Sequence, residues 1–158
     1  MAQIYAAVVP GERLDAVYLP SWSRFDANGR QLGDASTLKE APEAMLGPVD
    51  EMQREILDFA HTFGDVELRR KTSLVGPHKD EVAFFINGRN ARLFASQGQQ
   101  RTIVLCWKLA EVEVVRDVLG VEPLLLLDDV MSELDERHRF ALTEFIDRSV
   151  QTFVTTTN

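Results

Sequence analysis

The sequence has a single cysteine, no long apolar run and no secretory leader pattern, and each absence excludes a class of protein. Cys106 has no second thiol with which to form an intramolecular disulfide, which is typical of a reducing compartment, so we expect a cytoplasmic protein. No apolar run approaches the roughly 18 residues that span a bilayer. The N-terminus also lacks a basic region followed by an apolar stretch and a cleavage site. We therefore expect no membrane partner.

Positive charge is scarce as well. Seventeen Lys and Arg residues face 25 Asp and Glu residues, which gives a net charge of −8 and argues against a dedicated nucleic-acid module. The basic residues are nevertheless concentrated between Arg69 and Arg101, where only Asp80 and Glu81 oppose them. Such a zone suits a polyphosphate or a DNA backbone, although an ordinary solvated face would have the same composition.

The chain also lacks the Gly-x-x-x-x-Gly-Lys-Ser/Thr loop that cradles nucleotide phosphates. Gly29 and Gly98 precede basic residues, but the spacing does not match. The length of 158 residues is sufficient for one well-buried core, so one domain is the first expectation.

The most informative stretch of the sequence is residues 124–127, four leucines that are followed directly by Asp128 and Asp129. A run this short and uniformly apolar predicts a strand covered on both faces, as in a parallel sheet. Because an unpaired buried charge is costly, the strand should deliver both carboxylates to its carboxyl end, where open α/β sheets bind ligands. The alternative is a structural strand that runs into an acidic turn.

A second informative stretch is residues 96–101, Ser-Gln-Gly-Gln-Gln-Arg. Ser96 and Gln99 form a capping-box pattern for a helix that should end near Leu119 at Gly120. Its first turn combines free N–H groups, a glycine and Arg101, which suits an anion, although a polar cap alone is the alternative. The residues expected on its buried face are Ile103, Val104, Trp107, Ala110, Val114, Val115 and Val118.

The remaining pattern predicts a mixture of strands and helices. In the first half we expect strands at 4–9 and 14–19, a short helix near 41–46, and a helix from about 52 that Gly64 stops. A hairpin at Asn87-Gly88 should join strands at 82–86 and 91–94. In the second half we expect a helix at 136–148, with Phe140, Leu142 and Ile146 inward, and a buried strand at 151–157. This alternation indicates an α/β protein.

Three segments in order resemble one family of ATPases. Residues 96–101 resemble the signature motif of ATP-binding-cassette ATPases, residues 124–129 resemble a Walker B strand, and residues 132–135, Ser-Glu-Leu-Asp, resemble the D-loop. Together with Gly-Pro-His-Lys-Asp at 76–80, they resemble RecF, the bacterial recombination-mediator ATPase related to the SMC proteins. The resemblance is strong from about residue 69 to residue 157.

The resemblance implies the C-terminal half of an ABC/SMC-like P-loop ATPase head, in which parallel strands are flanked by helices and accompanied by a β-hairpin. Residues 71–158 would form this part of the head. Residues 1–70 would form the return half of an inserted helical lobe together with connecting strands.

The resemblance also implies ATP and Mg²⁺ as cofactors. Asp128 would hold Mg²⁺, and Asp129 would polarise the attacking water. In the D-loop, Ser132 and Asp135 would cross the dimer interface, and Thr156 lies where relatives have a switch histidine. The residues that would bind the γ-phosphate of ATP held by a second protomer are Ser96, Gln97, Gly98, Gln99, Gln100 and Arg101.

The partners implied are DNA with single-strand/double-strand junctions, the proteins RecR and RecO, and a second copy in an ATP-dependent homodimer. Arg89 and Arg92 are the candidates for DNA or partner contact. Because the phosphate loop is missing, we expect a C-terminal fragment that cannot hydrolyse ATP alone. The alternatives are a fragment of an SMC-like chromosome ATPase and a non-catalytic interaction module.

Overall fold

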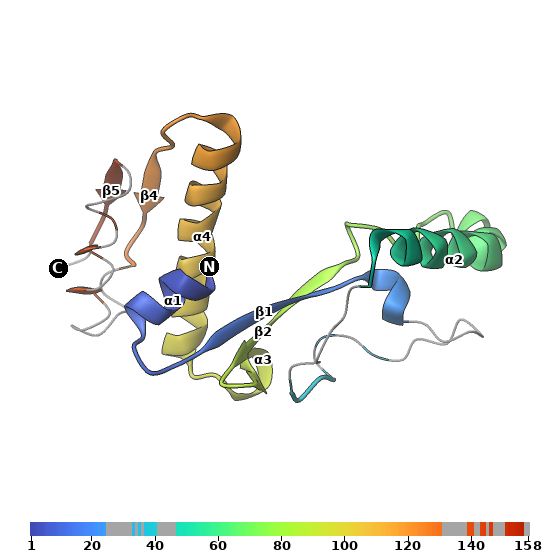
Figure 1. Ribbon diagram of the computed structural model, residues 1–158, viewed down its shortest axis with the longest axis horizontal. Coiled ribbons are helices and arrows are strands. Elements are labelled where there is room, and N and C mark those ends of the chain that lie inside the picture. Colours follow the sequence, from blue (N-terminus) through green and yellow to red (C-terminus); the bar gives the residue numbers. More distant parts are fainter. Residues whose placement is uncertain are drawn as a thin grey trace. The chain divides into compact units, whose positions relative to one another are not determined.

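The computed structural model describes residues 1–24, 33, 35, 37–40, 47–130, 139–140, 143–144, 146 and 151–156. It divides into two compact units, one formed by Met1–Leu14 with Ala95–Asn158 and the other by Asp15–Phe94 (Figure 1). The first unit holds helices with a parallel strand pair, and the second holds an antiparallel hairpin with a long helix. The expected α/β class is confirmed.

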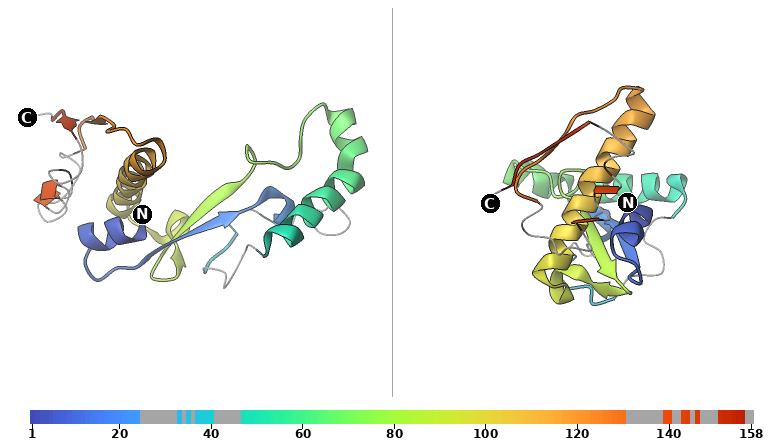
Figure 2. Two further views of the ribbon diagram at one scale, coloured as in Figure 1. Left: turned by 45° about the horizontal axis from the view of Figure 1, so that its top comes forward. Right: turned by 90° about the vertical axis from the view of Figure 1, so that its left-hand side faces the viewer.

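The first unit begins with a helix where the sequence pattern predicted a strand. α1 (Ala2–Val8) buries Ile4, Tyr5 and Val8, which lie on one helical stripe, and this stripe packs against α4 (Gln97–Leu119). Figures 1 and 2 show α1, in blue, beside α4 in each view. The prediction of a strand at 4–9 is therefore wrong, because the apolar residues follow a helical spacing and a neighbouring helix is available to cover them.

α4 has the predicted bounds but not the predicted buried face. Its C-cap, Gly120, adopts the left-handed conformation (φ 63°), as expected of a terminal glycine. Val104, Val114 and Val118 are 59–74% exposed, so their predicted burial is wrong. The predicted set combined two stripes of the helix, and only one of them is covered in the described structure. The buried residues of α4 are Thr102, Ile103, Leu105, Cys106 and Leu109.

The acidic-ended strand is present as β4 (Leu125–Leu127), paired in parallel with β5 (Thr152–Val154) in the register Leu127↔Val154. Leu125 and Leu127 are buried, whereas Leu126 is 70% exposed, as period-two alternation requires when one face is covered. The prediction of a strand covered on both faces is therefore wrong for the described residues.

The last predicted helix and strand are only partly confirmed. Ile146 is buried as expected, but Phe140 is 67% exposed instead of pointing inward. The strand predicted to be buried at 151–157 is observed as β5, yet Phe153 remains 55% exposed. Leu142 lies outside the described residues.

The second unit contains a three-stranded sheet in the order β1 (Leu14–Leu19), β2 (Glu81–Ile86) and β3 (Arg89–Asn90). The predicted strand at 14–19 and the hairpin at Asn87-Gly88 are confirmed, and both turn residues have positive φ. The residues that form the core of this unit are Leu19, Ala35, Ala83 and Phe85.

The return strand of the hairpin is shorter than predicted, because residues 91–94 form the short helix α3 (Ala91–Phe94). The buried side chain of Asn90 explains the change. Its amide nitrogen donates to the carbonyls of Ala35 and Leu38, and its Oδ1 accepts from the Arg92 N–H at 2.9 Å. The Asn90 side chain thus binds the backbone at both sides of the point where β3 ends and α3 begins.

The 3₁₀ helix η1 (Ser21–Arg24) contacts α2 (Val49–Arg70), where the Trp22 indole donates to Glu55 at 3.0 Å. The expectation that Gly64 stops α2 is wrong, because the helix continues through it and ends at Lys71 in the left-handed conformation. An interior glycine weakens a helix by only about 1 kcal/mol, which its neighbours can offset. The helix expected near 41–46 lies outside the described residues.

The loop at 76–80 is anchored by Asp80, whose carboxylate accepts from the Ser21 N–H at 2.7 Å and from the Tyr18 hydroxyl. Burial on its own raises the pKa of Asp80, but these two donors and the nearby Arg24 outweigh it and hold the pKa below its usual value. Asp80 thus connects this loop to Tyr18 in β1 and to Ser21 at the start of η1.

Within the described ranges, no helix is long and apolar enough to cross a membrane.

Cys106 should be inert in the folded chain. The thiol is fully buried, and this burial raises its pKa from about 9 to about 12, with the N-terminal amino group lowering it in the opposite direction. We expect no reaction with a thiol reagent at pH 8 until urea unfolds the chain. Because the folded pKa is the higher one, the stability contributed by the neutral thiol is present below pH 9 and is lost as the pH rises toward 12. Rapid labelling of the native chain would contradict this assignment.

Candidate functional site

The two carboxylates predicted from the sequence do lie at the carboxyl end of β4. Asp128 is exposed and Asp129 is half-buried, immediately after the last residue of the strand. Asp129 has a positive φ of 51°, a conformation that few residues other than glycine adopt and that the short side chain of Asp tolerates. The left-handed residue turns the chain out of the sheet directly after the acidic pair.

Thr155 holds this turn in place. Its hydroxyl donates to Oδ1 of Asp128 and accepts from the Asp129 N–H at 3.1 Å, while its own N–H donates to the Leu127 carbonyl at 2.9 Å. One side chain thus orients the first carboxylate and satisfies the backbone of the second. Thr155 could not be predicted from the sequence, because its position beside Asp128 follows only from the parallel register of β4 and β5.

The acidic pair suits a cation that is shared with phosphates. Mg²⁺ usually keeps several waters and binds one or two carboxylates together with phosphate oxygens. Among the described residues no group of three His, Cys, Asp or Glu side chains could enclose a metal ion. Two carboxylates at one strand end match the number that Mg²⁺ takes from a protein when nucleotide phosphates and water supply its other ligands.

The start of α4 has the predicted capping box. The Ser96 hydroxyl accepts from the Gln99 N–H at 3.2 Å, and the Gln99 side chain accepts from the Ser96 N–H at 2.9 Å. Ser96, Gln97 and Gly98 are exposed, so the first N–H groups of the helix face solvent. Because the Ser96 oxygen accepts a hydrogen bond, its hydroxyl hydrogen can still donate to an anion.

Gln100, the last of the three glutamines in this turn, folds back as well. Gln100 donates from its side chain to the carbonyl of Ala95 at 3.2 Å, and its N–H donates to the Ser96 carbonyl at 3.0 Å. Arg101 is exposed one residue later. The segment therefore exposes N–H groups and one cation, while Gln99 and Gln100 stabilise the turn.

The remaining predicted site residues are distributed elsewhere in the fold. Thr156 is exposed after β5, and Ser132 and Asp135 lie outside the described residues. In the second unit, the Arg89 guanidinium lies over the Phe94 ring at 4.2 Å from its centroid, and Arg92 is exposed on α3. The structure thus places the two arginines at the hairpin, in the unit that does not carry the acidic pair.

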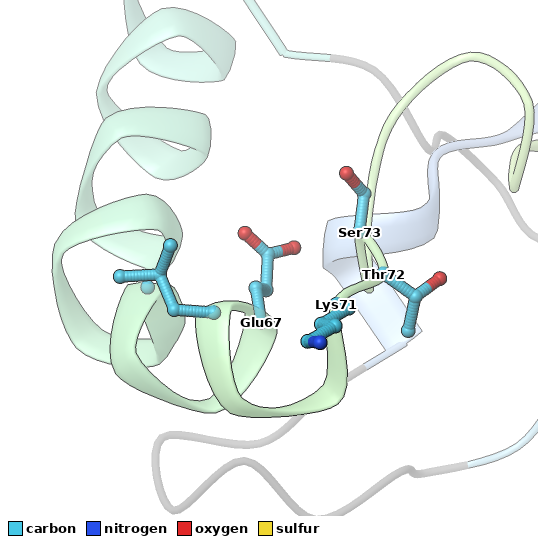
Figure 3. Close-up of a pocket in the computed structure, with 6 residues that line it drawn as sticks. Glu67, Lys71, Thr72 and Ser73 are labelled. Atoms are coloured by element: carbon cyan, nitrogen blue, oxygen red, sulfur yellow. The ribbon is translucent and has the colours of Figure 1, made fainter.

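A shallow pocket lies at the end of α2, lined by Gly64, Glu67, Leu68, Lys71, Thr72 and Ser73 (Figure 3). Glu67 lies on its rim and accepts from the Leu74 N–H at 2.6 Å. None of the site residues predicted from the sequence lines this pocket.

Several known proteins that are similar to this chain are RecF proteins. The chain is 52% identical over 108 residues to the DNA replication and repair protein RecF of Lactobacillus delbrueckii subsp. bulgaricus. This match covers 68% of the chain and 28% of that protein. The chain is 46% identical over 124 residues to RecF of Geobacillus kaustophilus, covering 77% and 33% respectively. Over the matched residues the chain is similar to RecF proteins. No family model matches the chain.

Solved structures agree with the sequence comparison. The recombination mediator protein RecF bound to ATP, from the RecFOR pathway, superposes with a TM-score of 0.63 at 26% identity. The match covers 98% of this chain and 36% of that structure. The chain spans about a third of the length of the RecF proteins that it matches.

The Thr155 hydroxyl should be necessary for the acidic turn. Replacing Thr155 by Val keeps the shape but leaves the Asp129 N–H without its acceptor, which should lower the free energy of unfolding by roughly 1 kcal/mol in urea denaturation. Thr155→Ser retains the hydroxyl and should stay close to the unmodified chain. A loss in Thr155→Ser together with no loss in Thr155→Val would show that the methyl group, and not the hydroxyl, is responsible.

Proposed function

We propose that this chain supplies the signature motif, the Walker B strand and the D-loop of a RecF-type ATP-dependent DNA-binding clamp, which acts in the recombinational repair of gapped DNA. The proposal rests on two polar turns of the first unit, each of which is held by hydrogen bonds. They are the Ser96 turn at the start of α4 and the acidic turn after β4, which Thr155 holds. The similarity to RecF supplies the reaction in which such ends serve.

Phosphoryl transfer depends mainly on positioning and charge neutralisation, which is what these two ends can provide. Asp128 would bind Mg²⁺ beside the β- and γ-phosphates, and Asp129 would orient and polarise the attacking water. Ser132, Asp135 and Thr156 complete the same interface in this proposal. Mg²⁺ supplies the neutralising charge when bound.

The Ser96 turn would act on ATP bound to a second protomer. Its exposed N–H groups and the positive end of the helix dipole favour a γ-phosphate, an interaction worth about 0.3–1 kcal/mol from the dipole alone. Nucleotide then holds two subunits together, so ATP binding closes the clamp and hydrolysis releases it.

The open face of the strand pair supports a place inside a larger head. Leu124, Leu126 and Phe153 are 53–70% exposed, although parallel strands are normally covered on both faces. We infer that the remainder of a RecF polypeptide covers this face. In that arrangement residues 71–158 belong to the ATPase head, and residues 1–70 to the inserted lobe with its connecting strands.

The trans role of the Ser96 turn can be tested with a complete RecF as the ATP-binding partner. We expect the chain to associate with G. kaustophilus RecF in the presence of ATP and Mg²⁺, and much less with ADP, in analytical ultracentrifugation. Ser96→Arg should abolish the ATP-dependent association because it fills the phosphate position. The chain alone should show no ATP turnover above background.

The control for this experiment is Thr62→Arg, which adds the same side chain to the exposed face of α2. It should leave the association unchanged. Association that is equally strong with ATP, ADP and no nucleotide would instead favour the alternative, a non-catalytic interaction module.

DNA contact is proposed for the hairpin arginines, with RecR and RecO as further partners of the whole protein. Both side chains are exposed, so two phosphate contacts are available. Changing Arg89 and Arg92 together to Glu should weaken binding to gapped duplex DNA about tenfold at low salt and reduce the slope of log Kd against log salt by about 2. Fluorescence anisotropy of the complex with RecF measures both quantities.

A matched double variant, Lys108→Glu with Arg116→Glu on α4, makes the same change in net charge elsewhere on the chain. It should have a much smaller effect than the hairpin variant. If the two double variants weaken DNA binding equally, only the net charge matters, and the hairpin is not the contact surface.

A further inference from the structure

Gln99 is the central residue of the α4 turn, and its side chain has two partners. Its Oε1 accepts from the Ser96 N–H at 2.9 Å, and its Nε2 donates to Oε1 of Glu12 at 2.9 Å. Glu12 lies 87 residues earlier in the chain, between α1 and β1. A residue from outside the helix therefore supports the capping box by binding the free end of the Gln99 amide.

Glu12 is itself held by a buried donor. Its second carboxylate oxygen, Oε2, accepts from the hydroxyl of Tyr5 at 2.7 Å, and Tyr5 is fully buried in α1. Burial, and after it the hydrogen bond and the charge of Glu12, raise the pKa of Tyr5, so the hydroxyl remains a donor at neutral pH. Both oxygens of Glu12 are thus engaged, one by the packed helix and one by the α4 turn.

The series of hydrogen bonds that links Tyr5, Glu12, Gln99 and Ser96 restricts the orientation of each side chain. An amide side chain has one carbonyl oxygen and one NH₂ group. Both ends of Gln99 are in use, so its orientation is determined: a flipped amide would place its oxygen against the Glu12 carboxylate and its nitrogen against the Ser96 N–H. With Gln99 held, the Ser96 oxygen accepts the Gln99 N–H, and the Ser96 hydroxyl hydrogen remains able to point outward.

We propose that Glu12 is a positioning residue for the α4 turn. It acts through Gln99 to pre-organise the Ser96 hydroxyl and the first N–H groups of α4 for an anionic oxygen ligand. Gln99 then serves the turn rather than the ligand. The functional part of this inference rests on the proposed function, because it takes the ligand to be the γ-phosphate bound by a second protomer.

A positioning role predicts a local effect that needs no nucleotide. In ¹⁵N-labelled chain, Glu12→Ala should raise the exchange rate of the Ser96 amide about threefold or more, because Gln99 loses the acceptor that orients it. Glu12→Gln keeps an oxygen for the Gln99 amide and a second group for Tyr5, so it should retain most of the protection. Tyr5→Phe should have an intermediate effect in the same direction.

The matched control is Glu111→Ala. Glu111 is also a glutamate with two side-chain partners, Trp107 and Lys108, but it lies further along α4. This variant should leave the Ser96 amide unchanged. Unchanged Ser96 exchange in Glu12→Ala, or equal loss in Glu12→Ala and Glu12→Gln, would overturn the inference.

The functional consequence is measured in the association with RecF described above. Glu12→Ala should raise the ATP concentration for half-maximal association about threefold or more, with the maximal extent unchanged, while Glu12→Gln should stay within about twofold. An unshifted midpoint in Glu12→Ala would overturn the ligand part of the inference. If the unmodified chain shows no ATP-dependent association, the proposed function fails, and the amide exchange still decides whether Glu12 positions the turn.

Discussion

The parallel pairing of β4 with β5 is the interaction on which the acidic turn depends. In the register Leu127↔Val154, the residue after β5 lies beside the residue after β4, and this is how the Thr155 hydroxyl reaches both Asp128 and Asp129. A slip of one residue would exchange the faces of the strand and move the hydroxyl away. The Asp128 carboxylate and the Asp129 backbone are held by one hydroxyl because the second strand ends at the same level.

The turn at the start of α4 uses the same principle with different chemistry. A short polar segment is held by a partner that is distant in the sequence, and the groups that could contact a ligand are left facing solvent. At the acidic turn the partner is a hydroxyl from the neighbouring strand, and at the α4 turn it is the carboxylate of Glu12, supported by the buried Tyr5. The pairing of β4 with β5 holds Thr155 in place, and the buried Tyr5 of α1 holds Glu12.

The apolar surface of the first unit has a related explanation. α4 buries the stripe that faces α1, whereas Val104, Val114 and Val118 are exposed, and β4 buries alternate residues only. The sequence pattern predicted broader burial because it reports how apolar a face is, and not which neighbour covers it. The chain spans about a third of its RecF relatives, which is consistent with faces whose neighbours belong to the rest of such a protein.

Features that depend on near neighbours in the sequence could be predicted from the sequence alone. The capping box at Ser96, the terminal Gly120, the hairpin at Asn87-Gly88 and the exposed acidic end of the leucine strand all follow from rules that act within a few residues. The resemblance to RecF, carried by three short motifs, was confirmed by the comparisons.

Other features required the tertiary structure, since they depend on which distant segments meet. α1 is a helix because α4 covers its apolar stripe, and the hairpin ends early because the Asn90 side chain binds two carbonyls from a distant loop. The roles of Thr155 and Glu12 could not be predicted from the sequence for the same reason. Sequence determined the polar groups available to this protein, and the pairing of β4 with β5 and of α1 with α4 decided how those groups are held, because a hydrogen bond requires its two atoms to lie about 3 Å apart whatever their distance along the chain.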